Sequence, residues 1–203
     1  MSVPRSSHLP TRLLHLLLIN AIHGGFVSTL FLIASCAPSR EALVYPLKDS
    51  TVVSADRELR LRVPEGWFVP VDGDAASGLL FWLVKEDYLA TMGLEEIRAD
   101  ETVRKNLSAE RLEALGQLSF SLKKSRDTSA SILRGPDVFR LNKKNFCSYE
   151  YSLDKGARTV RTVVFSTSKK IYELTAFPSP RKAPSVMQPV FDAQQAILQT
   201  IEW

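Results

Sequence analysis

The sequence predicts an α+β fold, in which an antiparallel β-sheet is flanked by helices. Three observations support this prediction. Strand-like runs separated by short polar turns occupy residues 138–177, as in an antiparallel meander. One segment before this meander and one after it carry apolar residues at helical spacing. Each of these helices has one apolar side, so both are expected to pack against the sheet.

Residues 1–35 have the parts of a secretory signal in the expected order. Arg5 and Arg12 supply the positive flank, residues 26–34 supply the apolar core, and small residues precede the expected cleavage site. The run over residues 13–35 is also long enough to span a bilayer, but polar residues and a glycine pair interrupt it, namely His15, Asn20, His23 and Gly24-Gly25. We therefore expect a cleaved signal peptide, with an uncleaved anchor helix as the alternative.

The end of this segment, Leu32-Ile33-Ala34-Ser35-Cys36, resembles the bacterial lipobox, in which an aliphatic residue and two small residues precede a lipidated cysteine. The resemblance implies that a lipoprotein signal peptidase recognises Leu32, Ile33, Ala34 and Ser35 and cuts before Cys36, whose thiol carries a diacylglyceryl group. Each buried methylene contributes about 0.8 kcal/mol to membrane binding, so two or three acyl chains anchor a protein stably. A free cysteine that happens to follow an apolar stretch is the alternative.

The expected cut divides the chain into a signal peptide over residues 1–35, a tether over 36–50 and a single α+β domain over 51–203. Removing 35 of the 203 residues would leave 168, a usual size for one domain. Ala37 is not acidic, so nothing resembles the aspartate that retains some lipoproteins in the inner membrane. We expect a protein that is lipid-anchored in the cell envelope, at the periplasmic face of the outer membrane if the host has two membranes.

The composition is that of an ordinary globular protein, with 45% hydrophobic and 24% charged residues. The net charge is +4 for the whole chain and about +2 once the two leader arginines are removed. This small excess does not favour a nucleic-acid binder.

The first half of the domain is expected to contain several strands. Apolar and charged residues alternate over residues 58–63, as in a half-buried strand, and Pro64-Glu65-Gly66 then turns the chain. Residues 79–84 form a continuous apolar run, typical of a strand buried on both faces, and residues 93–98 are expected to form a short strand. Asp72-Gly73-Asp74 is interpreted as a solvated turn, because the other ligands of a calcium loop are missing.

An amphipathic helix follows, with Asp100 or Ser108 as its N-cap. A basic cluster at residues 123–126 ends the helix, where cations complement the helix dipole. Because the opposite side is polar, packing against a sheet explains the pattern better than insertion into a membrane. The apolar stripe is expected to contain Leu112, Leu115, Leu118 and Leu122.

The second half is predicted to form four antiparallel strands, over residues 138–142, 146–153, 159–167 and 171–177. In the second strand, Cys147 shares one face with Tyr149, Tyr151 and Leu153. A catalytic thiol needs a base beside it, and no histidine is available in this part of the chain. Cys147 is therefore interpreted as a small buried hydrophobe.

Prolines stop this meander, and a last helix is expected from about Val186, with Pro189 in its first turn. Trp203 is expected to close the side of this helix that packs on the sheet. That side is formed by residues at helical spacing, namely Val190, Phe191, Gln194, Ile197, Leu198 and Ile201.

Three short motifs resemble the PsbP-like group of proteins, which includes the Ran-binding Mog proteins and the DcrB lipoproteins. They are the turn Pro64-x-Gly66-Trp67, the hairpin from Val163-Val164-Phe165 to Tyr172-Glu173-Leu174-Thr175-Ala176, and the ending Phe191-x-x-x-Gln195-x-x-Leu198-x-x-Ile201-x-Trp203. The resemblance covers most of residues 51–203 and implies an α/β/α sandwich that serves mostly as a binding or assembly module. No functional residue of the group is matched here.

The domain is predicted to hold no catalytic, cofactor-binding or metal-binding residue. All three histidines, His8, His15 and His23, precede the expected cut, which removes histidine-dependent catalysis and the common zinc sites from the mature chain. No glycines have the spacing of a phosphate-binding loop. A carboxylate pair, Asp87 with Glu95 or Glu96, is the alternative, as in a glycosidase.

These observations predict a non-catalytic lipoprotein, without a cofactor, that binds or assembles with a protein partner in the cell envelope. Its candidate contacts are the basic turns Lys143-Lys144, Lys169-Lys170 and Arg181-Lys182, unless these are merely solvated. Two alternatives use the same lipid anchor. One is a small carboxylate-dependent hydrolase, and the other is a carrier that holds an apolar ligand between the sheet and a helix.

Overall fold

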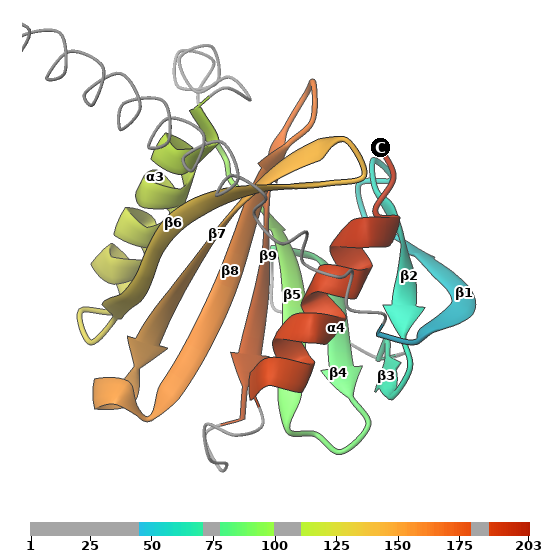
Figure 1. The fold of residues 1–203 in the computed structure, drawn as a ribbon, viewed down its shortest axis with the longest axis horizontal. Helices are drawn as coiled ribbons and strands as arrows, with labels where there is room; N and C mark the ends of the chain where they lie inside the picture. Colours follow the sequence, from blue (N-terminus) through green and yellow to red (C-terminus); the bar gives the residue numbers. More distant parts are fainter. Residues whose placement is uncertain (1–44, 71–77, 100–110, 180–186) are drawn as a thin grey trace, which may run out of the picture. The chain divides into compact units, whose positions relative to one another are not determined.

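Seven of the strands form one antiparallel sheet in the order β3-β4-β5-β9-β8-β7-β6, and two more form a separate pair, β1-β2 (Figure 1). The structure is a computed structural model that describes residues 45–70, 78–99, 111–179 and 187–203. Within these residues the elements are β1 (Leu47–Val53), β2 (Arg60–Pro64), β3 (Trp67–Phe68), β4 (Leu79–Lys85), β5 (Ala90–Glu96), α3 (Leu112–Arg126), β6 (Ser131–Leu141), β7 (Lys144–Leu153), the 3-10 turn η2 (Asp154–Gly156), β8 (Arg158–Ser166), β9 (Ile171–Pro178) and α4 (Met187–Thr200).

The predicted α+β fold is confirmed, and so is the four-strand meander, because each of β6 to β9 pairs antiparallel with the next. The two helices lie on opposite faces of the sheet. Along β8, Val163 and Phe165 belong to the core that includes residues of α4, and Val164 belongs to the core that includes residues of α3. The result is a helix-sheet-helix sandwich (Figure 1).

Helix α4 closes the larger of the two cores. Pro189 is its third residue, so its missing N–H falls in the first turn as predicted. The side chain of Gln194 is buried, and its Nε2 donates to the carbonyl oxygen of Leu174 at 2.8 Å. Trp203 stacks on Phe165 with ring centroids 5.5 Å apart, and the ammonium of Lys144 lies 3.9 Å from the centroid of the Trp203 ring. The predicted apolar side of this helix is confirmed.

The β1-β2 pair was only half predicted, because β1 begins at Leu47 within the stretch expected to be a tether. Most of β1 is exposed, so its sequence has no apolar alternation to signal a strand. It is held instead by main-chain pairing with β2 and by Arg62, whose guanidinium donates to the carbonyl oxygen of Lys48 at 3.0 Å and to Asp49 at 3.1 Å.

Asp56 connects the loop between β1 and β2 to β9. Its carboxylate accepts hydrogen bonds from Ser54 Oγ at 2.5 Å, Lys170 Nζ at 2.8 Å and the Tyr172 hydroxyl at 3.1 Å. Burial alone would raise the pKa of Asp56, but these hydrogen bonds and one from the backbone of Glu58 outweigh burial and lower the pKa to about 2. The group is therefore a permanent anion at neutral pH.

The buried side of α3 differs from the stripe of leucines expected from the sequence. Leu112 and Leu115 are buried as predicted, but Leu122 is 41% exposed. Gly116 and Ser119 are buried in place of Leu118 and Leu122. An added Cβ on Gly116 would lie 2.8 Å from the Sγ of Cys147, so the missing side chain is what allows this close approach of α3 to β7.

Two strands also begin away from their expected limits. β5 begins at Ala90 rather than residue 93, and β6 begins at Ser131 rather than residue 138. β6 is an edge strand that is mostly exposed, so its first half lacks the apolar alternation of a strand packed on a core. In the part of the chain that the structure describes, no helix is long and apolar enough to cross a membrane.

Candidate functional site

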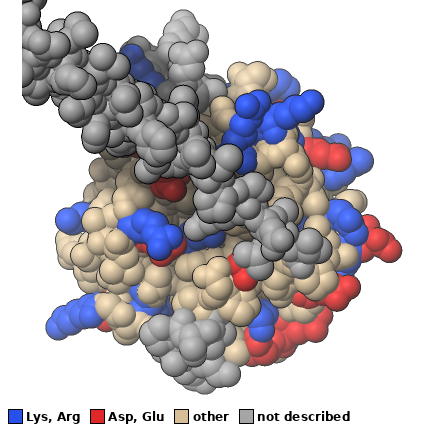
Figure 2. Space-filling model, viewed as in Figure 1, with Lys and Arg blue, Asp and Glu red and all other residues tan. Residues whose placement is uncertain are grey.

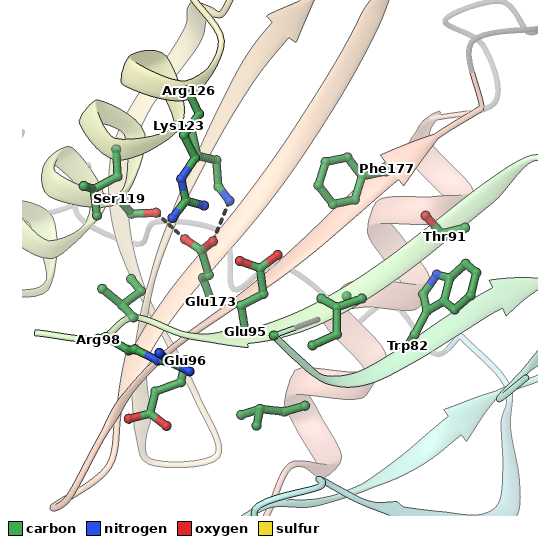
Figure 3. Close-up of a pocket in the computed structure, with 16 residues that line it drawn as sticks. Trp82, Thr91, Glu95, Glu96, Arg98, Ser119, Lys123, Arg126, Glu173 and Phe177 are labelled. Atoms are coloured by element: carbon green, nitrogen blue, oxygen red, sulfur yellow. Dashed lines mark hydrogen bonds and ion pairs between the residues drawn. The ribbon is translucent and has the colours of Figure 1, made fainter. Parts of the chain in front are cut away.

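A cavity of about 890 Å³ lies beside α3, on the face of the sheet that this helix covers (Figure 3). We call it the α3 pocket. Its floor is formed by β4, β5 and β9, and one wall is formed by α3. The apolar lining residues are Leu79, Leu80, Trp82, Ile97, Leu122 and Phe177. The charged lining residues are Glu95, Glu96, Arg98, Lys123, Arg126 and Glu173.

One residue of the floor, Gly93, has no side chain. Gly93 of β5 lies opposite Trp82 of β4 on one side and Thr175 of β9 on the other. A Cβ added to Gly93 would enter the cavity and meet only the side chain of Leu79, at 2.9 Å. Glycine in the middle of a strand destabilises it slightly, and such a residue often marks a place where another group approaches closely.

A buried ion pair fixes the wall of the pocket to its floor. Glu173 of β9 is 6% exposed, and its two carboxylate oxygens accept from Lys123 Nζ at 2.5 Å and from Ser119 Oγ at 2.6 Å (Figure 3). Ser119 has one proton, which it donates to Glu173, so the Tyr149 hydroxyl 2.7 Å away is the donor to Ser119. Both oxygens of Glu173 are therefore engaged within the protein.

Tyr149 acts here as a neutral hydrogen-bond donor. Burial raises the pKa of Tyr149 well above its usual value, and the hydrogen bond with Ser119 acts in the opposite direction. The chain Tyr149, Ser119, Glu173 and Lys123 thus joins β7, β9 and α3 through one carboxylate.

Glu95 is the second acid of the pocket floor and lies directly opposite Glu173 in the antiparallel register of β5 and β9. Residues that face each other in this way have side chains on the same face of the sheet, with Cβ atoms about 5 Å apart. Figure 3 shows the carboxylate of Glu95 pointing into the cavity beside Glu173. Among the described residues, none forms an ion pair or hydrogen bond with Glu95.

The remaining charges lie at the edge of the pocket. Glu96 is 3.5 Å from Lys170 Nζ and is therefore paired. Arg98 follows the end of β5, and Arg126 is the last residue of α3. Of the acidic residues that the structure describes, none forms an ion pair with either arginine. Among the described lining residues, one carboxylate and two guanidinium groups therefore have no ion-pair partner.

The carboxylate pair that the sequence left as an alternative is not formed between Asp87 and either Glu95 or Glu96. Asp87 lies in the turn between β4 and β5 and pairs with Lys85, while Glu95 and Glu96 lie at the far end of β5. From residue 90 to residue 95 an extended strand covers about 17 Å, which is far beyond the separation of glycosidase carboxylates. The acid that does face Glu95 is Glu173, and the sequence signal for it was a charged residue within an otherwise apolar strand.

Three lysines of the described basic turns form contacts within the domain. Lys144 Nζ donates to the carbonyl oxygen of Ile201, Lys169 lies 3.3 Å from Glu58, and Lys170 lies 2.8 Å from Asp56. Lys and Arg side chains are spread over the face shown in Figure 2 and are not gathered in one patch. The expectation that these turns contact a partner stays a prediction.

Cys147 is completely buried, which confirms its interpretation as a small hydrophobe. Burial is the main cause that raises the pKa of its thiol to about 11. Within the described ranges, no group of three His, Cys, Asp or Glu side chains is placed to hold a metal ion.

Several predictions of the sequence concern residues that lie outside the described ranges. These include the signal peptide over 1–35, the lipobox residues Leu32, Ile33, Ala34 and Ser35, and the lipidated Cys36. The other such residues are Asp72-Gly73-Asp74, the N-cap candidates Asp100 and Ser108, and Arg181-Lys182.

The fold and the pocket together define an antiparallel sandwich with a ligand-sized cavity between the sheet and one helix. No protein-family model and no curated protein sequence matches the chain. The fold is that of the PsbP-like proteins. The chain is similar to cyanobacterial PsbP (CyanoP) from Synechocystis sp. PCC 6803, with a TM-score of 0.55 and 12% identity over 83% of this chain and 97% of that one.

Two further solved structures are more distant. LpqN of Mycobacterium tuberculosis, described as involved in cell envelope biogenesis, has a TM-score of 0.36 and 14% identity, over 76% of this chain and 90% of that one. A protein from Bacteroides thetaiotaomicron has a TM-score of 0.36 and 12% identity, over 78% of this chain and 48% of that one. At these identities the likeness to cyanobacterial PsbP establishes a shared fold and no shared activity.

Proposed function

We propose that this chain is a lipid-anchored, non-catalytic binding protein of a bacterial cell envelope, and that the α3 pocket is its binding site. The observation that carries the proposal is the pocket itself. Its volume of about 890 Å³ lies within the range of ligand sites, about 300–1,000 Å³, and its lining combines apolar and charged side chains in equal number. Glu95 points into this space without a partner from the described residues.

The state of Glu173 supports binding over catalysis. A carboxyl group that acts as a general acid must carry a proton and give it to the substrate. Glu173 instead accepts from Lys123 and Ser119 through its two oxygens, so both oxygens are occupied within the protein. It is better suited to hold α3 in place than to exchange protons with a bound molecule.

A carboxylate-dependent hydrolase remains the second candidate, on the single observation that Glu95 and Glu173 face each other across β5 and β9. Incubation of the purified protein with a panel of glycosides and esters separates the two functions. Turnover by the wild type that is lost in Glu95→Gln and retained in Glu113→Gln, on the exposed side of α3, would identify an enzyme. No turnover above background is expected.

The lipid anchor is supported by the lipobox residues ending at Cys36. We expect the protein expressed in a bacterium to incorporate an alkyne-labelled fatty acid, and the mature N-terminus found by mass spectrometry to be an acylated Cys36. Cys36→Ser is expected to stay unlabelled and uncut. A wild-type protein that is secreted without label would overturn the anchor.

The proposal that the α3 pocket binds a ligand is tested by identifying small molecules that stay bound during purification. The protein is extracted from membranes with a mild detergent, purified, and analysed for bound small molecules by mass spectrometry. Gly93→Leu, which places a side chain on the floor of the cavity, is expected to lose a molecule that the wild type carries. Gly135→Leu is the matched control, because a side chain at Gly135 on β6 would meet no atom within 4 Å. Equal retention by both variants would contradict a ligand in this pocket.

A further inference from the structure

We infer that the α3 pocket takes a small zwitterion of the amino-acid type, a free amino acid or a short peptide with an apolar side chain. This inference rests on the proposed function and names the class of ligand for the same site. Two observations support it. One is the set of charges that have no ion-pair partner in the pocket, and the other is the order of charged and apolar groups along its floor.

The unpaired charged groups of the pocket include both an anion and cations. Lys123 neutralises Glu173 at 2.5 Å, and Lys170 is paired with Glu96 at 3.5 Å. Glu95, Arg98 and Arg126 have no ion-pair partner within the described residues. A ligand that carries only a cation would leave the guanidinium groups unpaired, and one that carries only an anion would leave Glu95 unpaired. A ligand with both charges satisfies all three.

Glu95 is a strong candidate for an ammonium group. It faces Glu173 directly, and like charges placed opposite each other on neighbouring strands destabilise the sheet. Lys123 relieves this repulsion only in part, because it contacts Glu173 alone. A ligand ammonium beside Glu95 would remove the remaining repulsion. The relief of this repulsion between Glu95 and Glu173 would add to the free energy of binding.

The order of groups along β5 distinguishes kinds of zwitterion. On the pocket side the strand presents Gly93 and then Glu95, and Arg98 follows beyond its end. Trp82 lies opposite Gly93, so along the strand the aromatic wall is on one side of Glu95 and Arg98 is on the other. Figure 3 shows the same order, with Phe177 on the side of Trp82 and Arg126 on the side of Arg98.

An α-amino acid matches this order, because its carboxylate, ammonium and side chain branch from one carbon and can point in three directions. The ammonium would meet Glu95, the carboxylate would meet the arginines, and an apolar side chain would lie over Gly93 against Trp82. An aminophospholipid places its phosphate between the ammonium and the acyl chains, so its order does not match. A volume of about 890 Å³ has room for a peptide of a few residues.

The test uses the full lipidated protein in detergent, dialysed free of small molecules, and four forms of one dipeptide, phenylalanyl-leucine. These are the free zwitterion, the N-acetyl form, the C-terminal amide, and the form capped at both ends. Binding is followed by calorimetry. We expect the zwitterion to bind most tightly, with a loss of affinity of about tenfold for each cap, because each removes one charge-assisted contact.

Two variants test which residues contact the ammonium and which contact the carboxylate of the ligand. Glu95→Gln is expected to abolish the difference between the free and the N-acetyl peptide, and Arg98→Gln combined with Arg126→Gln is expected to abolish the difference between the free peptide and its amide. Glu113→Gln and Arg140→Gln, both at exposed positions outside the pocket, are the matched controls and should preserve both differences. These readouts compare ligands within one variant, so a general loss of stability does not imitate them.

The outcomes separate this inference from the proposed function. If a capped peptide binds as tightly as the zwitterion, the pocket binds ligands but does not select zwitterions, and only the inference fails. If no peptide binds, the inference is judged by the identity of the molecule that the wild type retains and Gly93→Leu loses. A retained amino acid or peptide supports the inference, any other retained molecule overturns the inference alone, and no retained molecule overturns both.

Discussion

Glu95 and Glu173 are direct neighbours across β5 and β9, yet only Glu173 has a cation within the protein, Lys123 Nζ at 2.5 Å. Glu173 is 6% exposed and holds α3 to the sheet, while Glu95 is half-buried and faces the cavity. The two acids thus have different roles, so breaking the ion pair of Glu173 and removing the charge of Glu95 should affect stability differently.

Lys123→Met is expected to lower the free energy of unfolding by about 3 kcal/mol, because it leaves the buried charge of Glu173 without its cation. Urea unfolding at neutral pH measures this change. The double variant Lys123→Met with Glu173→Gln should be more stable than Lys123→Met alone, since no unpaired charge is left. A Lys123→Met protein as stable as the wild type would show that the ion pair does not hold α3.

Glu95→Gln is expected to leave the stability unchanged or to raise it by about 0.5 kcal/mol, because it removes a like charge opposite Glu173. The same urea experiment measures it, with Glu113→Gln as the control for loss of one acid at an exposed position. A loss of more than about 1 kcal/mol would mean that Glu95 has a structural partner in the folded protein.

Asp56 predicts a dependence of stability on pH. Its pKa is lowered from 3.8 to about 2 on folding, so its ionised form stabilises the fold by about 2 kcal/mol above pH 4. This contribution is lost as the pH falls through the folded pKa, that is between about pH 4 and pH 2. Asp56→Asn should therefore be less stable than the wild type at pH 7, and the difference should shrink across that window.

Asp49→Asn is the matched control for Asp56, because Asp49 also pairs with a cation but its side chain is fully exposed. Its stability should follow that of the wild type at every pH. A difference between Asp56→Asn and the wild type that stays constant from pH 5 to pH 2 would contradict the assignment.

Gly116→Ala tests the close contact between α3 and β7. Alanine favours a helix over glycine by about 1 kcal/mol, yet here its Cβ would lie 2.8 Å from Cys147 Sγ and 3.1 Å from Pro136 Cβ. We expect a net loss of about 1–3 kcal/mol in thermal or urea unfolding. Adding Cys147→Ala should recover part of this loss, and Gly135→Ala, in open space, should have little effect.

The number of reactive thiols per chain tests both the burial of Cys147 and the acylation of Cys36. Cys147 is completely buried, and burial raises the pKa of its thiol to about 11, so it should react very slowly with a disulfide reagent in the folded protein at pH 8. In denaturant, protein purified from membranes should show one reactive thiol per chain, because Cys36 is expected to be acylated. A second reactive thiol would contradict the acylation.

The sequence predicted the parts of the fold that depend on local signals. The meander from β6 to β9 followed from apolar runs and short polar turns, and the buried side of α4 followed from helical spacing. β1 was missed because its pairing with β2 depends on main-chain bonds and on Arg62, which leave no periodic pattern. The strand at Leu47 therefore lay within the expected tether.

The residues of the pocket were missed for a different reason. Ser119 was not among the residues expected on the buried side of its helix, because nothing in the nearby sequence shows that Tyr149 and Glu173 satisfy its hydroxyl. Glu95 was noticed as an acid, but its opposite residue was set by the register of two strands far apart in the chain. Gly93, which leaves part of the floor without a side chain, looked like any glycine in a short strand. Only the paired sheet brings these residues together.

The strands that form the floor of the pocket carry the larger core on their other face, with Met92 and Leu94 of β5 and Leu174 and Ala176 of β9 packed beneath α4. A bound molecule therefore rests on backbone that is already ordered. Little conformational entropy of the protein remains to be lost in the sheet on binding, so the entropic penalty falls mainly on the ligand and on the long side chains of α3. This pre-organisation favours short, stiff ligands over long flexible ones of the same charge.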